Sequence, residues 1–192
     1  MTKMRKWMTM LALLIGMVAS AQNAETLYKE GKALYDKKDY VKAVVKLKPA
    51  AEKGHKKAQY RLGRCYEKGN GVKKDEKQAF NWYSKSAEQG YAKAQYQVGK
   101  CYKEGEGTVK DRKKAIHYFT LAAKQDNPDA QYQLGKAYLK GKDVPADEAK
   151  AKSLLKKAIS NEKDGKEILK KIKDDAANGD EDAKKILTLL KK

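Results

Sequence analysis

Side chains that most enzymes depend on are scarce in this sequence. Of its 192 residues only His55 and His117 are histidines, and neither stands at a spacing typical of a metal site or a catalytic triad. A general base needs a partner within hydrogen-bond reach, and the sequence indicates none for either histidine. The glycines of segments 69–71 and 105–107 lack the Gly-Lys-Ser/Thr ending of a phosphate-binding loop. We therefore expect no catalytic, metal-binding or cofactor-binding residues, and a protein that is not an enzyme.

Long apolar stretches are also missing beyond the N-terminus, so no membrane-spanning helix is expected there. The N-terminus itself has basic residues within its first six positions, an apolar stretch over residues 7–18, and Ala-Ser-Ala at 19–21. This order is typical of a cleaved secretory signal, and an uncleaved N-terminal anchor is the alternative. The apolar stretch is shorter than the ~20 residues that a helix needs to span a bilayer. We predict a signal peptide over residues 1–21 and export to the periplasm or the extracellular space.

Acidic residues are few relative to basic ones. The chain has 44 Lys and Arg against 25 Asp and Glu, which gives a formal net charge of +19 at pH 7. Such a charge can indicate nucleic-acid binding, but the basic residues are spread through the whole chain, and export would remove the protein from most nucleic acid. We therefore expect no nucleic-acid partner. An acidic protein or peptide, an acidic envelope polymer and an anionic membrane surface fit better, with binding that weakens at high salt.

A repeat of 36 residues dominates the rest of the sequence. The tripeptide Ala-Gln-Tyr begins at residues 58, 94 and 130, and matching glycines, tyrosines and alanines follow each copy. Within each repeat, apolar or small residues recur twice at the i, i+4, i+7, i+8 spacing of an amphipathic helix. Glycines at the joint predict a left-handed turn that ends the first helix. An aspartate then stands where the second helix needs an N-cap, at Asp75, Asp111 and Asp147.

The first full-length repeat carries the pattern Ala58-Gln59-Tyr60-x-Leu62-Gly63, Tyr66-x-x-Gly69-x-Gly71-Val72, Asp75, Ala79-x-x-Trp82-Tyr83-x-x-Ser86-Ala87 and Gly90. This pattern closely resembles the Sel1-like repeat (SLR) family, which is related to the tetratricopeptide repeats. The resemblance covers about residues 25–161. It implies an all-α fold, a right-handed α-α superhelix (solenoid) of antiparallel helix pairs, and a role in the assembly of protein complexes.

The repeat spacing and the resemblance together predict five segments after the signal peptide. They are a tetratricopeptide-like first repeat at 22–54, Sel1-like repeats at 55–90 and 91–127, a divergent repeat at 128–162, and a degenerate repeat with C-terminal cap helices at 163–192. The fourth repeat departs from the pattern at Asp143, which replaces a glycine, and at Leu154-Leu155, which replace Trp-Tyr. Because one helix pair cannot bury its apolar side alone, we expect the repeats to stack.

Equivalent positions on the first helices carry two sets of side chains, one aromatic and one cationic. The sets are Tyr28, Tyr60, Tyr96 and Tyr132, and Lys32, Arg64, Lys100 and Lys136. In tetratricopeptide-like folds these helices line a concave groove, so the resemblance implies that both sets face it. One interpretation is that the tyrosines pack between helices and the cations form a solvated rim. The other is that both sets form a groove that attracts an anionic partner.

The two cysteines, Cys65 and Cys101, occupy the same position in successive repeats. Packed helices lie ~8–10 Å apart, whereas a disulfide needs Cα atoms ~4.4–6.8 Å apart, so free buried thiols are favoured over a bridge. The function that we expect is an exported scaffold or adaptor that binds a protein or peptide partner through the concave face of its repeats. The alternative is binding of an acidic cell-envelope polymer or an anionic membrane surface through its basic face.

Overall fold

The computed structural model describes residues 20–191, so most of the predicted signal peptide lies outside the described residues. Every regular element in this part of the chain is a helix, which confirms the predicted all-α fold. None of these helices is long and apolar enough to cross a membrane. The described residues form two units, which meet between Gln89 and Gly90 in the sequence.

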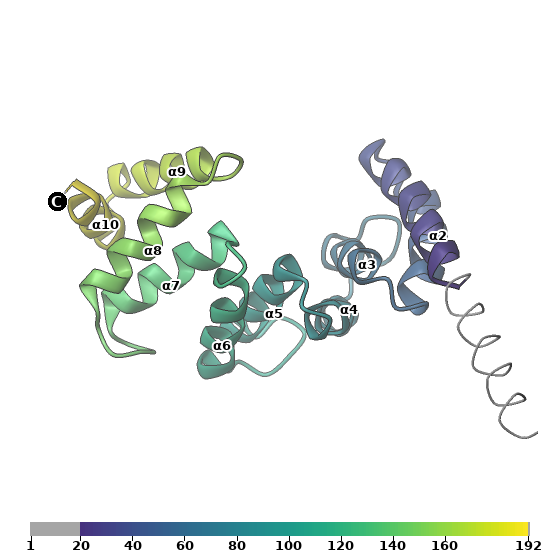
Figure 1. Ribbon diagram of the computed structural model, residues 1–192, viewed down its shortest axis with the longest axis horizontal. Coiled ribbons are helices and arrows are strands. Elements are labelled where there is room, and N and C mark those ends of the chain that lie inside the picture. Colours follow the sequence, from purple (N-terminus) through teal and green to yellow (C-terminus); the bar gives the residue numbers. More distant parts are fainter. Residues whose placement is uncertain (1–19, 192) are drawn as a thin grey trace, which may run out of the picture. The chain divides into compact units, whose positions relative to one another are not determined.

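In the first unit a helix runs through residues 20–36 and is followed by α2 (Tyr40–Glu52), α3 (Lys56–Lys68) and α4 (Glu76–Glu88) (Figure 1). Its core is built from alanines and a few large apolar side chains at helix contacts. The fully buried large residues include Leu47, Leu62 and Tyr83. Small residues allow the helices to approach closely, and the large ones fill the space between them.

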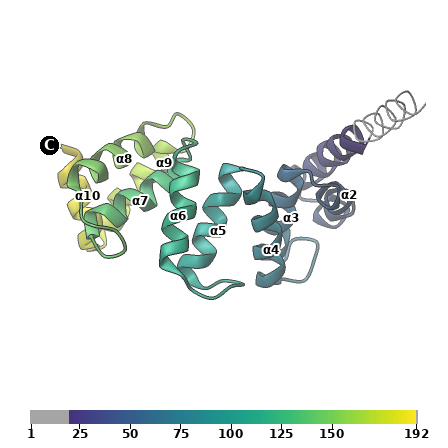
Figure 2. The ribbon, with the colours of Figure 1, turned by 60° about the horizontal axis from the view of Figure 1, so that its bottom comes forward.

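The second unit contains α5 (Ala92–Glu104), α6 (Arg112–Ala123), α7 (Pro128–Lys140), α8 (Glu148–Ser160), α9 (Gly165–Ala177) and α10 (Glu181–Lys191). The pairs α5–α6 and α7–α8 lie side by side, as both views show (Figures 1 and 2). The last three helices contact one another and bury Leu155, Ile172 and Ile186. The predicted stacking of helix pairs is therefore present within this unit.

The helix boundaries follow the capping residues that the repeat predicts. Asp75, Asp111 and Asp147 are the N-caps of α4, α6 and α8, and each carboxylate accepts a hydrogen bond from the backbone N–H three residues later, at 2.9, 2.9 and 2.8 Å. Such a cap stabilises a helix by about 1 kcal/mol. The first helices end on left-handed glycines, with φ of 72°, 84° and 65° at Gly69, Gly105 and Gly141. Both predictions are confirmed.

A second glycine in each repeat explains how closely its two helices pack. A Cβ added to this glycine would lie 2.7 Å from a side chain of the partner helix, and real Cβ atoms essentially never approach so closely. The contacts join Gly63 to Tyr83, Gly99 to Phe119 and Gly135 to Leu155. The same close contact between α3 and α4 therefore recurs between α5 and α6 and between α7 and α8.

Both cysteines are free thiols and both are buried, as the spacing argument predicted. Burial raises the pKa of Cys65 to about 11, although Arg64 and Arg61 oppose the effect. At neutral pH this thiol is therefore protonated and a poor nucleophile, because the thiolate is the reactive form. Cys65 is thus a small apolar core residue.

Candidate functional site

Two of the four predicted tyrosines belong to the cores of their units. Tyr28 is 9% exposed and stacks on His55 with ring centroids 4.4 Å apart. Tyr132 is 5% exposed and packs in the cluster that contains Leu155 and Ile172. These two side chains present little area to a partner, as the packing interpretation requires.

The other two tyrosines are half-buried against the second helix of their own repeat. The ring of Tyr60 lies 5.8 Å from that of Tyr83, and the ring of Tyr96 lies 5.8 Å from that of Phe119. Both pairs are tilted, by 40° and 37°, within the usual range for buried aromatic contacts. Part of each ring remains at the surface, so these tyrosines combine packing with some accessible area.

His55, one of the two histidines, has a structural role. It is the N-cap of α3, where its Nδ1 accepts the Ala58 N–H at 3.1 Å. Because Nδ1 accepts, the neutral ring carries its proton on Nε2, which donates to Glu25 at 2.8 Å. This hydrogen bond lowers the pKa of Glu25. The ring therefore joins two elements of the first unit, the helix at residues 20–36 and the N-terminus of α3.

The four predicted cations differ in their surroundings. Lys32 pairs with Asp36 at 2.6 Å and Lys100 pairs with Glu104 at 3.9 Å, each one turn along its own helix. Arg64 is half-buried in the first unit. Lys136 lies with its Nζ 5.5 Å from the ring centroid of Tyr132 and also lines a pocket. Lys136 is therefore the member of the predicted cationic set that lines a pocket in the second unit.

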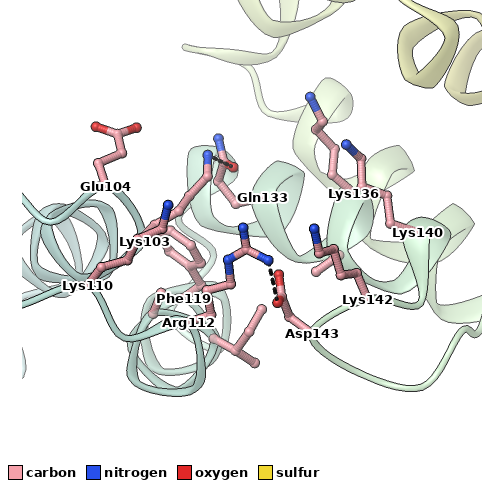
Figure 3. Close-up of a pocket in the computed structure, with 13 residues that line it drawn as sticks. Lys103, Glu104, Lys110, Arg112, Phe119, Gln133, Lys136, Lys140, Lys142 and Asp143 are labelled. Atoms are coloured by element: carbon pink, nitrogen blue, oxygen red, sulfur yellow. Dashed lines mark hydrogen bonds and ion pairs between the residues drawn. The ribbon is translucent and has the colours of Figure 1, made fainter.

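This site, which we call the basic pocket, has a volume of about 500 Å³ and is formed by α5, α6, α7 and the loops that follow α5 and α7 (Figure 3). Six cationic side chains line it: Lys103, Lys110, Arg112, Lys136, Lys140 and Lys142. The lining includes only two acidic residues, Glu104 and Asp143. Apolar groups of Ala115, Ile116, Phe119 and Ala137 also line it, and we call these four residues the floor of the pocket.

Internal contacts compensate only part of this positive charge. Arg112 lies 3.5 Å from Asp143 in a partly exposed pair, and Lys140 pairs with Asp182 of α10. Lys103 donates to the neutral amide oxygen of Gln133 at 3.2 Å. An amide oxygen carries no net charge, so this last contact orients the ammonium group without neutralising it.

The pKa of Lys103 is lowered first by burial and further by the neighbouring positive charges. Burial lowers the pKa, Glu104 opposes that effect, and Lys136, Lys100 and Lys171 lower it further. Neighbouring cations disfavour the charged form of Lys103, and an anion that enters the site would favour it. An anion in the basic pocket would therefore relieve part of the repulsion among these cations.

Most of these cations were missed by the sequence analysis, which predicted Lys136 alone. The signal was present in the repeat register. Positions 36 residues earlier carry the opposite charge at four of the six cations, because Lys103, Arg112, Lys140 and Lys142 correspond to Glu67, Glu76, Glu104 and Glu106. A comparison of the charge at each position between repeats reveals this change of sign. The aromatic and cationic sets on the first helices include only Lys136 of these six cations.

The structural repeats agree with the family comparison. The Sel1 repeat model matches four consecutive segments, residues 24–55, 56–91, 92–127 and 128–162. The chain belongs to the Sel1 repeat family. Proteins of this family are helical scaffolds that generally mediate protein interactions and are generally not catalytic. Within the described residues, no group of three or more His, Cys, Asp or Glu is placed to hold a metal ion.

Two solved Sel1-type structures are similar to this chain. A Sel1 repeat protein from Oxalobacter formigenes is 33% identical with a TM-score of 0.65, over 71% of this chain and 53% of that one. A protective antigen of uropathogenic Escherichia coli strains with an SLR fold is 32% identical with a TM-score of 0.69, over 78% of this chain and 33% of that one. The chain thus spans about half of the first protein and a third of the second. No match was found among curated proteins.

Proposed function

We propose that this Sel1 repeat protein is an exported scaffold or adaptor, active in the periplasm or outside the cell, that binds an acidic protein or peptide. Export is supported by the basic, apolar and Ala-Ser-Ala order of the first 21 residues. The acidic character of the partner is supported by the basic pocket, which concentrates six cations around one hollow of the second unit.

The charges of the pocket favour a binding role over a structural one. Lys136 disfavours the charged form of Lys103, since after burial it contributes to the lowered pKa of Lys103. Stability alone does not explain why such groups are gathered at one place. Complementary charge on a partner accelerates association and selects against basic competitors. A negatively charged partner would therefore gain both speed and specificity from this arrangement.

The predicted groove residues remain part of this proposal in different degrees. In the second unit, Lys136 lines the pocket and Lys100 adds positive charge near Lys103, so we assign both to partner binding. Tyr96 offers a half-exposed ring on the same helix as Lys100. In the first unit, Tyr60 and Arg64 are half-buried and supply the corresponding surface.

A second candidate is binding of an acidic envelope polymer or an anionic membrane surface, favoured by the net charge of +19. Such a ligand needs cations spread over a face and has no use for an apolar hollow. Ile116, Phe119 and Ala137 of the floor line the same pocket as the cations. This feature favours a protein partner, which can present carboxylates and apolar groups together.

Affinity capture from an envelope extract of the producing cells tests the proposal. Three baits are compared. They are the wild-type chain, a pocket variant with Lys103→Glu and Lys136→Glu, and a control variant with Lys113→Glu and Lys156→Glu. The control makes the same change of charge in the same unit at exposed residues outside the pocket lining. We expect the wild type and the control to retain a discrete acidic protein that the pocket variant loses.

Salt and ligand type separate the two candidates. At about 0.5 M salt, where screening lengths fall to a few Å, we expect the captured protein to be released. Equal capture by the pocket variant would contradict the role of the pocket. Co-sedimentation of the chain with envelope polymer or anionic liposomes, in place of a retained protein, would support the second candidate.

A further inference from the structure

We propose that the basic pocket binds one aromatic or large aliphatic side chain of an acidic peptide segment, with the acidic residues on either side of it held by the surrounding lysines and arginine. This inference rests on the proposed function and names the chemistry of the partner. It requires a ligand in which an apolar group is flanked by negative charge, and excludes a plain polyanion as the preferred ligand.

The floor of the pocket is suited to an apolar group. Phe119 and Ala115 are each 2% exposed and form its base, while Ile116 and Ala137 are half-buried and remain accessible at the surface. The pocket volume of about 500 Å³ lies within the range of sites that hold small ligands or side chains. An incoming apolar side chain would leave water here and gain contact with these groups.

The cations approach this floor from three directions. Figure 3 shows Lys103 and Lys110 on one side, Lys136, Lys140 and Lys142 on the opposite side, and Arg112 between them. Carboxylates that precede and follow a central apolar residue can therefore both reach positive charge. A ligand with negative charge on one side alone would leave the opposite cations unpaired.

Arg112 can change partners on binding. Its distance to Asp143 is 3.5 Å, and both side chains are partly exposed at 44% and 31%. Exposed pairs of this kind contribute about 0–1 kcal/mol to stability. A ligand carboxylate that offers two oxygens to the guanidinium group can compete with Asp143, because bidentate pairs of this type are the stronger ones.

The preceding repeat shows that the helical scaffold does not require this pocket. At the positions of Lys103 and Phe119 it carries Glu67 and Tyr83, and the Tyr83 hydroxyl donates to the Glu67 carboxylate at 2.9 Å. In the second unit the carboxylate is replaced by an ammonium group and the hydroxyl is missing. The exchange places an ammonium group and a phenyl ring where the preceding repeat has a hydrogen-bonded carboxylate and hydroxyl.

This comparison provides a variant that should fold. Lys103→Glu together with Phe119→Tyr transfers the Glu67–Tyr83 pair into the second unit at the matching positions. The same hydrogen bond already joins α3 and α4, which pack as α5 and α6 do. We therefore expect unchanged helicity by circular dichroism. We expect the variant to bind acidic peptide at least about 10-fold more weakly than the wild type. The pocket would have a carboxylate in place of the Lys103 cation and a hydroxyl on the ring of residue 119.

The direct test is fluorescence anisotropy with labelled, C-terminally amidated heptapeptides. One peptide has phenylalanine between two Glu-Asp-Glu segments, the second has alanine there, and the third is heptaglutamate. We expect the phenylalanine peptide to bind the wild type about 10-fold or more tightly than the other two, the lower end of what burying such a side chain contributes. Equal binding of all three peptides would overturn the inference.

Further variants locate the preference. Ile116→Ser removes apolar area from the accessible part of the floor, and we expect it to reduce the preference for phenylalanine over alanine while both peptides still bind. Lys113→Glu with Lys156→Glu should keep the preference. If Ile116→Ser left the preference unchanged, the phenylalanine would be bound elsewhere and the inference would be wrong.

The outcome can be separated from that of the proposed function. Capture of an acidic protein that depends on Lys103 and Lys136, without any preference among the peptides, would sustain the scaffold and overturn the apolar anchor. A preference for the phenylalanine peptide, with no protein captured, would sustain the pocket and overturn its use in a scaffold.

Discussion

The same position of the repeat has opposite chemistry in the two units of this protein. In the first unit the buried hydroxyl of Tyr83 donates to Glu67, and both burial and this carboxylate raise the pKa of Tyr83. In the second unit Phe119 and Lys103 stand at these positions, and Lys103 turns to Gln133. In the first unit the two side chains bond to each other, while in the second unit both line the basic pocket.

The difference shows how a repeat protein separates stability from binding. The helix contact at Gly63 and Tyr83 is matched by the contact at Gly99 and Phe119, with 2.7 Å from a hypothetical Cβ to the ring in both. The backbone arrangement of the two helix pairs is therefore the same. Two side chains in each pair decide whether the polar groups bond to each other or line a pocket. Repeat families can vary binding in this way because each repeat packs only on its immediate neighbours, so a surface change in one repeat leaves the other contacts intact.

The largest expected effect is on the packing that both units share. Gly63→Val and Gly99→Val should each destabilise the protein by about 3 kcal/mol, because the added side chain would overlap the ring of Tyr83 or Phe119. Urea denaturation followed by circular dichroism measures the loss, with Lys77→Ala on the exposed side of α4 as the control. A large loss for one glycine and none for the other would contradict the equivalence of the two helix pairs.

A smaller effect is expected from breaking the hydrogen bond that closes the first unit. Tyr83→Phe should cost about 1.5 kcal/mol, since Glu67 is charged and loses a donor. Phe119→Tyr alone should also destabilise, and Lys103→Glu should recover that loss by supplying the acceptor. Chemical denaturation of the two single variants and the double variant gives the coupling energy, and a coupling near zero would mean that the pair does not transfer.

The smallest effect concerns the charge of Lys103. Its folded pKa lies below the unfolded value, so the folded protein binds this proton less well. The resulting cost to stability is fully present at neutral pH and disappears as pH rises from the folded pKa to the unfolded pKa. Lys103→Gln should therefore raise the melting temperature slightly. The gain in the free energy of unfolding should stay below about 1 kcal/mol, because the side chain is partly solvated.

Thermal unfolding at pH 7 in low salt measures this change, with Lys113→Gln as the matched control. The same variant should weaken binding of the acidic phenylalanine peptide, because anion binding requires the charged ammonium group. A variant that is more stable but binds more weakly identifies Lys103 as a binding residue. If Lys103→Gln were less stable than the control, the interpretation that burial and neighbouring cations make the charged form of Lys103 costly would be wrong.

Local features of the chain were predictable because their signals lie within one repeat. The aspartate N-caps and left-handed glycines need only the residues of one turn, and Asp75 and Gly69 are where the repeat pattern places them. The free state of the cysteines followed from packing distances alone. The role of the tyrosines was left open between packing and binding, since periodicity cannot tell how much of a ring such as Tyr132 a neighbouring helix covers.

By itself the sequence determined the all-α repeat, the helix boundaries and the excess of positive charge, because these depend on periodicity, capping residues and composition. Only the tertiary structure decided where that charge gathers. The basic pocket takes Lys103 from α5, Arg112 from α6 and Lys136 from α7, residues as far as 33 positions apart. Their proximity depends on how closely three helices pack, and the approach of α5 to α6 is set by the contact of Gly99 with Phe119 in the core.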